Sequence, residues 1–192
     1  NDVGFSTDEI LLISATNSSL ATKYKDELIS EGASSVDIIA VEANNADDPE
    51  IKIKIADAKK RLFVDNAWDD ISGFLLGGQA GELLNSKIRE TDAIVGFVGD
   101  NSRFAGRVVV QNYLVSGAAY YGELEFDDGL GLLNTSVIIP NTYFGSDFYE
   151  NTASAIPYTL VTENLTYGIW LSTGNYIKYS PIDNQTYINA FG

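Results

Sequence analysis

Apolar and polar residues follow one another in blocks along the first half of the chain, and the blocks have the lengths of strands and helices. The apolar run Ile10–Ala15 predicts a short, fully buried parallel strand. The next block predicts a helix that runs to about Ile29 and ends at Gly32. Val36–Val41 is apolar again and predicts a second strand.

The same alternation continues to about residue 121. The predicted elements are a helix from Pro49 to near Lys60, a strand at 61–66, a helix over 68–90 broken at Gly77-Gly78, a strand at 92–99 and a helix from Phe104 to about Tyr121. Strand-helix alternation at these lengths implies right-handed crossovers. We therefore expect an α/β fold, with a mainly parallel sheet and helices on both faces.

The pattern changes after Gly129, where short apolar segments rich in tyrosine are separated by turn residues. The predicted strands are Val137–Ile139, Tyr158–Val161, Tyr167–Leu171, Tyr176–Tyr179 and Tyr187–Ala190. We expect them to form a β-rich C-terminal extension of the same sheet. Residues 1–192 then make a single α/β domain, with strand-helix alternation over 1–128 and the β-rich part over 129–192.

Charge excludes several classes of partner. The chain has 27 acidic and 12 basic residues and a formal net charge of −15. Nucleic acids and anionic membranes are repelled by such a chain, whereas cations and basic partners are attracted. No apolar run approaches the roughly 20 residues of a membrane-spanning helix, so no membrane insertion is expected.

The chain contains no cysteine and no histidine. Disulfides, thiolate nucleophiles and zinc–cysteine sites are therefore excluded. The sequence begins at Asn1, which suggests either a mature chain after removal of a signal peptide, secreted or held at the cell surface, or a piece excised from a longer chain. Four Asn-X-Ser/Thr sequons agree with export, and they are either glycosylation candidates or unmodified polar loops. They lie at Asn17, Asn134, Asn164 and Asn184.

Four segments together resemble a known family. Ile10–Thr16 resembles its opening strand, Leu62–Ala67 stands where it has Phe-Phe-Thr-Gly-Gly-Asp-Gln, and Ala93–Gly96 stands where the strand before the nucleophile belongs. Gly129–Leu133, followed by a strand, is similar to the family's Gly-Leu-Gly-Leu-Leu segment. The family is that of cyanophycinase and aspartyl dipeptidase, which are serine peptidases. The resemblance implies the flavodoxin-like, class I glutamine amidotransferase-like fold.

The chemical motifs of that family do not carry over. Its nucleophile turn, Gly-Thr-Ser-Ala-Gly-Ala, aligns with a segment that has Val98 and Gly99 at the turn and no serine. A shifted frame brings in Ser102, but Arg103 then crowds a turn that needs small residues. The family's catalytic histidine falls near Tyr143, whose ordinary pKa makes it a poor base at neutral pH. The resemblance therefore implies a degenerate member without a catalytic triad.

Other groups have a chemical and a structural interpretation. Ser102 could be a nucleophile or, as we expect, the N-cap of the helix from Phe104. The segment from Gly96 to Gly106 matches neither a P-loop nor a dinucleotide fingerprint, so no cofactor is expected. Three pairs of adjacent carboxylates could bind Ca²⁺ or serve a glycosidase. None of the pairs has EF-hand spacing, so we expect them to cap helices or form turns rather than bind a metal. The pairs are Asp47-Asp48, Asp69-Asp70 and Asp127-Asp128.

These features predict a catalytically inactive, peptidase-like, extracellular module that binds a partner or has a structural role. Self-association, as in a surface layer or filament, is the specific version we expect, because 11 tyrosines supply contact surface. Another extracellular protein is the other partner considered. Two alternatives stay open: a serine hydrolase with a site rebuilt around Ser102, and a carbohydrate-binding module that uses exposed tyrosine and Trp170.

Overall fold

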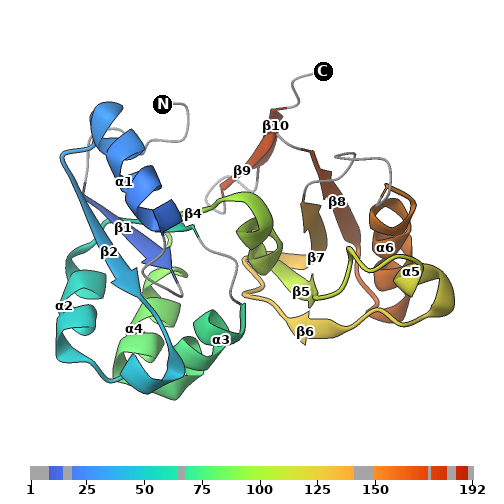
Figure 1. Ribbon diagram of the computed structural model, residues 1–192, viewed down its shortest axis with the longest axis horizontal. Helices are drawn as coiled ribbons and strands as arrows, with labels where there is room; N and C mark the ends of the chain where they lie inside the picture. The colour runs from blue at the N-terminus through green and yellow to red at the C-terminus, as the bar shows by residue number, and fades with distance from the viewer. Residues whose placement is uncertain are drawn as a thin grey trace. The chain divides into compact units, whose positions relative to one another are not determined.

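The structure is a computed structural model that describes residues 9–14, 19–64, 68–140, 149–172, 174–180 and 185–189. The chain divides into two compact units, Asn1–Asn101 and Ser102–Gly192 (Figure 1). The division falls at residue 102, earlier than the change of pattern at Gly129. The single domain expected over residues 1–192 stays a prediction.

The first unit is built on a parallel sheet. Its strands are β1 (Glu9–Ser14), β2 (Ser35–Ala40), β3 (Lys60–Phe63) and β4 (Ile94–Phe97). They lie in the order β2-β1-β3-β4, and every neighbouring pair is parallel. Five of the six residues of β1 are buried, as a strand covered on both faces requires. The parallel sheet predicted from the apolar runs is confirmed.

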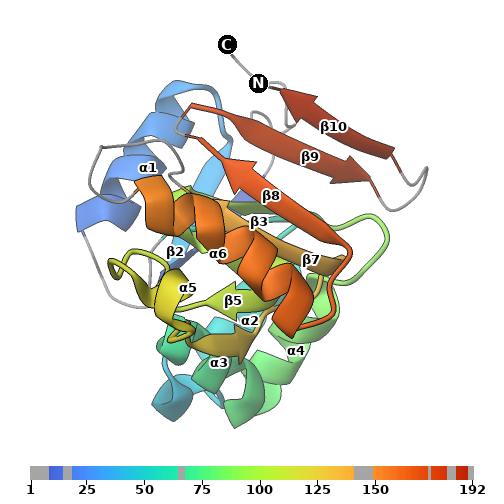
Figure 2. The same cartoon turned by 90° about the vertical axis from the view of Figure 1, so that its right-hand side faces the viewer.

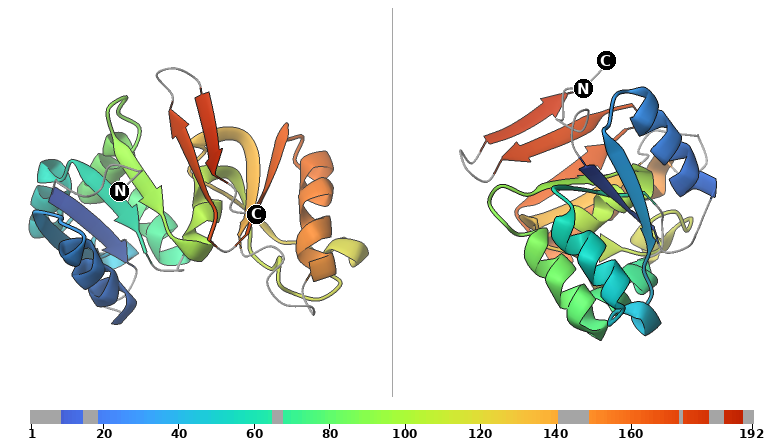
Figure 3. Two further views of the ribbon diagram at one scale, coloured as in Figure 1. Left: turned by 90° about the horizontal axis from the view of Figure 1, so that it is seen from above. Right: turned by 90° about the vertical axis from the view of Figure 1, so that its left-hand side faces the viewer.

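Helices cover both faces of this sheet. They are α1 (Ser19–Ser30), α2 (Pro49–Asp57), α3 (Trp68–Gly77) and α4 (Gln79–Lys87). Ala21 of α1 packs with Ile10 and Leu12 on one face. Right-handed crossovers put α2, α3 and α4 on the other face, because the chain reverses its direction across the sheet after β2. In agreement, α4 contacts both α2 and α3 (Figure 3).

The helix ends follow the local chemistry that the sequence indicated. Asp48 caps α2, since its Oδ1 accepts hydrogen bonds from the backbone N–H groups of Glu50 at 2.8 Å and Ile51 at 3.4 Å. The predicted break at Gly77-Gly78 separates α3 from α4. None of the helices in the described ranges has the length and apolar character needed to cross a bilayer.

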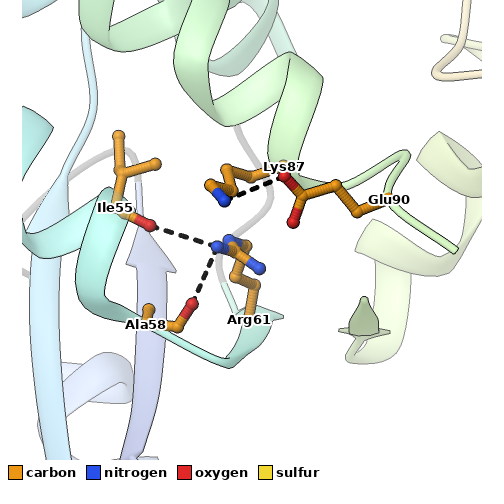
Figure 4. A network of polar contacts seen from close by, with 5 residues as sticks. All are labelled: Ile55, Ala58, Arg61, Lys87 and Glu90. Atoms are coloured by element: carbon orange, nitrogen blue, oxygen red, sulfur yellow. Dashed lines mark hydrogen bonds and ion pairs between the residues drawn. The ribbon is translucent and has the colours of Figure 1, made fainter. Parts of the chain in front are cut away.

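A buried cation joins α2 to the sheet. Arg61 of β3 is 2% exposed, and its Nη2 donates to the carbonyl oxygens of Ile55 at 3.1 Å and Ala58 at 2.8 Å (Figure 4). These carbonyls lie at the end of α2, where helical hydrogen bonding stops. Burial lowers the pKa of the Arg61 guanidinium, and the negative charge of Glu90 opposes that fall. Arg61 therefore acts as a structural clamp between α2 and β3.

The second unit contains a mixed sheet and a hairpin. The strands of the sheet are β5 (Gly106–Val110), β6 (Phe126–Asp128), β7 (Leu133–Pro140) and β8 (Tyr167–Leu171), in the order β6-β5-β7-β8. β6 runs antiparallel to β5, whereas β5, β7 and β8 are parallel. β9 (Tyr176–Ser180) and β10 (Gln185–Asn189) form the antiparallel hairpin.

Two helices pack on this second sheet, α5 (Ala118–Tyr121) and α6 (Tyr149–Thr162) (Figure 2). Ile156 of α6 is buried with Val137 and Ile139 of β7. Gly168 of β8 permits the close approach of α6, because a Cβ at that position would overlap Ile156 Cγ2. This sheet thus has its own hydrophobic core.

Three sequence predictions are wrong. Phe104–Tyr121 is not a helix, because its β-branched run Val108–Val110 forms β5. Tyr158–Val161 is not a strand but the end of α6, in which Ala155 and Thr159 are buried at helical spacing. The C-terminal strands do not extend the first sheet, since β7 and β8 pair beside β5 in a second one.

We predict that Arg61→Leu lowers the free energy of unfolding by about 2–3 kcal/mol, because two buried carbonyl groups lose their donor. Urea unfolding followed by Trp68 fluorescence measures this, in a Trp170→Phe background that leaves Trp68 as the one tryptophan of the sequence. The exposed neighbour Lys59 is the control, and Lys59→Leu should stay within about 0.5 kcal/mol of the parent. Equal stability of the two variants would contradict the clamp.

Candidate functional site

The end of β4 is the place to which the family resemblance assigns a nucleophile. Val98 continues the strand by donating from its backbone N–H to the carbonyl of Phe63 at 3.0 Å. The chain then turns at Gly99, which is exposed and has a φ of +60°. A Cβ at Gly99 would have no atom within 4 Å. The turn therefore has the open space of a nucleophile elbow, and Gly99 adopts the positive φ without strain because it has no Cβ.

Bulky groups surround the end of the strand. The rings of Phe63 and Phe97 stack at the ends of β3 and β4, with centroids 4.9 Å apart and planes at 11°. Val98, which the alignment puts at the nucleophile position, is half-buried. Neither Phe97 nor Val98 can accept or donate a proton through its side chain. This edge of the sheet is thus apolar where a peptidase needs a reactive hydroxyl.

Ser102 lies in the interior. It belongs to a 3₁₀ segment, Gly99–Ala105, and is 8% exposed. Its Oγ has no hydrogen-bond partner in the described part of the chain. The predicted role as N-cap is therefore wrong, because the segment leads into β5 rather than into a helix. A hydroxyl in this position is neither presented to solvent nor activated by a base.

Asn101 is equally enclosed. It is 1% exposed, and its Oδ1 also has no partner among the described residues. Its backbone N–H donates to the carbonyl of Val98 at 3.2 Å. A buried polar atom without a partner costs roughly 1–3 kcal/mol. Asn101 and Ser102, neighbours in the sequence, thus each have a buried polar atom without a partner among the described residues, a feature that the sequence pattern did not reveal.

Arg103 secures the second half of the same segment. Its buried guanidinium donates from Nη1 to the carbonyls of Val110 at 2.9 Å and Gln111 at 3.4 Å. The guanidinium carbon also lies 5.4 Å from the ring centroid of Phe104 and 5.7 Å from that of Tyr113. Arg103 is therefore engaged at the end of β5 as a structural cation. No pattern in the sequence around Arg103 indicated this role.

The remaining predicted site residues are only partly described. Tyr143, Asn17 and Asn184 lie outside the described residues. Asn134 is exposed, and its Oδ1 accepts from the backbone N–H of Thr135 at 2.9 Å. Asn164 is exposed after the end of α6, with a φ of +51°. Both described sequons are thus on the surface, where a glycan would meet no buried side chain.

The carboxylate pairs have structural roles. Asp47 Oδ1 accepts from the backbone N–H of Gln79 at 2.8 Å, and Asp48 caps α2. Asp69 and Asp70 stand in the first turn of α3, where negative charge is favoured. Asp127 accepts from the side chain of Gln111. Within the described residues, no three acidic side chains converge as a metal site would require.

We predict that Ser102→Ala leaves the free energy of unfolding unchanged or raises it by up to about 1 kcal/mol, because the change removes a buried polar atom that has no partner. Urea unfolding followed by Trp170 fluorescence, with Trp68→Phe, reports on the second unit. Thr159 is the control, since its buried Oγ1 donates to the Ala155 carbonyl at 2.7 Å and Thr159→Ala should be destabilising. A loss of more than about 1 kcal/mol in Ser102→Ala would show that the hydroxyl is bonded.

Comparison with known proteins supports a fold and nothing more specific. No model of a protein family and no curated protein matches this sequence. Solved structures do match. A putative peptidase E protein from Listeria monocytogenes EGD-e aligns with a TM-score of 0.63 and 16% identity over 96% of this chain and 86% of its own. A peptidase from an acI-B1 Actinobacterium aligns with a TM-score of 0.53 and 15% identity over 88% of this chain and 68% of its own.

Both neighbours have identities at which a structural likeness establishes the fold alone. That fold agrees with the parallel sheet and flanking helices described above, and with the type that the four sequence segments implied. The chain therefore has a peptidase-like α/β fold, similar to that of peptidase E and of the class I glutamine amidotransferase-like type.

Proposed function

We propose that this chain is a peptidase-like domain that performs no serine-peptidase chemistry and acts outside the cell as a binding or structural module. One observation carries the proposal: the turn after β4 has an apolar side chain at Val98, the position aligned with the serine, and no side chain at the exposed Gly99. A covalent mechanism needs a side-chain nucleophile at that position. Valine and glycine offer none.

The nearest hydroxyl does not replace it. Ser102 is buried, and none of the described carboxylates or lysines is bonded to its Oγ. The 192 residues contain no histidine, so no imidazole of this chain can take up the proton. Loss of both nucleophile and base leaves only binding and electrostatic stabilisation as sources of rate.

The surface properties support a role outside the cell. Asn134 and Asn164 are exposed sequons. A net charge of −15 favours solubility. A domain of this size can be stable without disulfides, so the absence of cysteine does not oppose export.

We predict no hydrolysis of aspartyl and β-aspartyl dipeptides by the purified chain above the rate in buffer. Release of free amino acids, followed by amine detection over hours, measures this, with an active peptidase E as the positive control. The alternative is a hydrolase that uses Ser102, favoured by the unbonded Oγ. Turnover that disappears in Ser102→Ala, while the variant stays folded, would establish that alternative and end the proposal.

Self-association is the form of binding that we propose, through the edge of the second sheet. β8 is the last strand in the order β6-β5-β7-β8, and its residues, Tyr167 to Leu171, carry no charge. Tyr167 and Trp170 are exposed on it. An uncharged edge strand without proline lacks the devices that prevent pairing with another chain. Two copies can therefore meet there despite their net charge.

We predict that the chain sediments as a monomer when dilute and as dimers or larger species at high concentration. The β8 substitution Ile169→Lys should return it to the monomer, because a charge then blocks strand pairing. Ile53→Lys, at an exposed residue of α2, is the matched control and should leave the sedimentation unchanged. A parent chain that stays monomeric at millimolar concentration contradicts self-association.

A further inference from the structure

A loop of the second unit, residues 111–125, is closed by its own hydrogen bonds. The backbone N–H of Gln111 donates to the carbonyl of Glu125 at 2.9 Å. The side chain of Asn112 then bridges the two sides: its Nδ2 donates to the Glu123 carbonyl at 2.8 Å, and its Oδ1 accepts from the Glu125 N–H at 2.9 Å. The neck of the 111–125 loop is thus fixed by three hydrogen bonds. Loops closed in this way are compact and frequently functional.

One face of the 111–125 loop is anchored in the core. The buried side chains are those of Tyr113, Ala118, Ala119 and Leu124. They form one cluster with Ala155 and Ile156 of α6. The short helix α5 lies within the loop, between two glycines in the left-handed region, Gly117 and Gly122. The loop is therefore anchored to the hydrophobic core of the second unit.

The other face exposes large apolar side chains. Tyr120 is 85% exposed and Tyr121 71% exposed, and their ring centroids lie 5.1 Å apart at 86°. Leu114 and Val115 are exposed in the same loop. Single exposed apolar residues are normal on a protein surface, but four large ones within eight positions of one loop are more than that background. Rigid tyrosines presented in this way are typical of recognition surfaces.

The exposed charged side chains of the loop and of the strand β6 are all acidic, and the guanidinium of Arg103 beneath the loop is buried. Glu123, Glu125, Asp127 and Asp128 are exposed in the loop and in the strand β6 that follows it. No lysine or arginine occurs between Arg107 and Lys178. The ring faces of tyrosine also attract cations. Aromatic faces and carboxylates together favour a ligand that carries positive charge and apolar groups.

We propose that the 111–125 loop binds a partner protein through an extended segment that contains arginine or lysine between apolar residues. Cationic groups would lie over the rings of Tyr120 and Tyr121, and the carboxylates of Glu123 and Glu125 would draw the segment in. Charge disfavours the other occupants: anionic lipid and nucleic acid are repelled, and a second copy also carries −15. The proposal does not depend on the absence of catalysis, because the loop shares no residue with Gly99–Ala105.

The test uses the full chain and a fluorescein-labelled peptide that alternates arginine with leucine. Its binding is measured by fluorescence anisotropy, with a peptide that has glutamate in place of arginine as the matched probe. We expect the arginine peptide to bind, more weakly as salt rises, and the glutamate peptide not to bind. Backbone amide shifts in the NMR spectrum should concentrate on residues 111–125.

Variants locate the contact. Tyr120→Ala/Tyr121→Ala should weaken binding at least about tenfold, and Tyr120→Phe/Tyr121→Phe should retain it, because the ring faces remain. Glu123→Gln should weaken binding and flatten its salt dependence. Ile53→Ala, which removes an exposed apolar side chain from the first unit, should have no effect.

Three results would overturn the proposal. They are unchanged binding in the double alanine variant, equal binding of the glutamate peptide, and absence of binding by the arginine peptide at low salt. Capture of the chain by anionic vesicles, or self-association that the double alanine variant abolishes, would assign the surface to another occupant and overturn it as well.

Discussion

The buried guanidinium of Arg103 fixes the segment that contains Ser102, the serine on which a rebuilt hydrolase site would depend. Its hydrogen bonds to the end of β5, and the rings of Phe104 and Tyr113 around it, fix the second half of the 3₁₀ segment. Ser102 precedes it directly and is held in the interior. A buried cation can be satisfied only by acceptors and rings placed around it. For the Ser102 hydroxyl to reach a substrate, Arg103 would therefore have to move and lose those contacts.

The fold could be predicted from the sequence where local and tertiary preferences agree. Ile10–Ala15 has strand length, apolar character and a following helix signal, and β1 formed as expected. Phe104–Tyr121 failed because apolar residues four apart suggested a helix, whereas the β-branched run Val108–Val110 formed a strand between two others. The prediction of a strand at Tyr158–Val161 was wrong in the opposite sense. Tyrosine and valine favour strands, but the segment is helical because α6 buries Ala155 and Thr159.

For the candidate site, the sequence predicted only which catalytic residues of the resembling family are missing. Composition already excluded imidazole and thiol chemistry, and the alignment already put glycine at the turn. The backbone φ of Gly99 and the burial of Ser102 depend on how the chain leaves β4, which no residue pattern specifies. Arg103 likewise needed the fold, because its acceptors Val110 and Gln111 come together with it only when β5 forms.

The 111–125 loop combines an exposed apolar face with attachments to the core of the second unit. An exposed tyrosine pair contributes nothing to the core, yet the loop that carries it is fastened by Asn112 and by four buried side chains. Ordering such a loop costs conformational entropy, which the buried face offsets. The outer face is then pre-organised, so a partner that binds it has little more entropy to lose. Rigid anchoring and outward apolar exposure together favour recognition over simple chain connection.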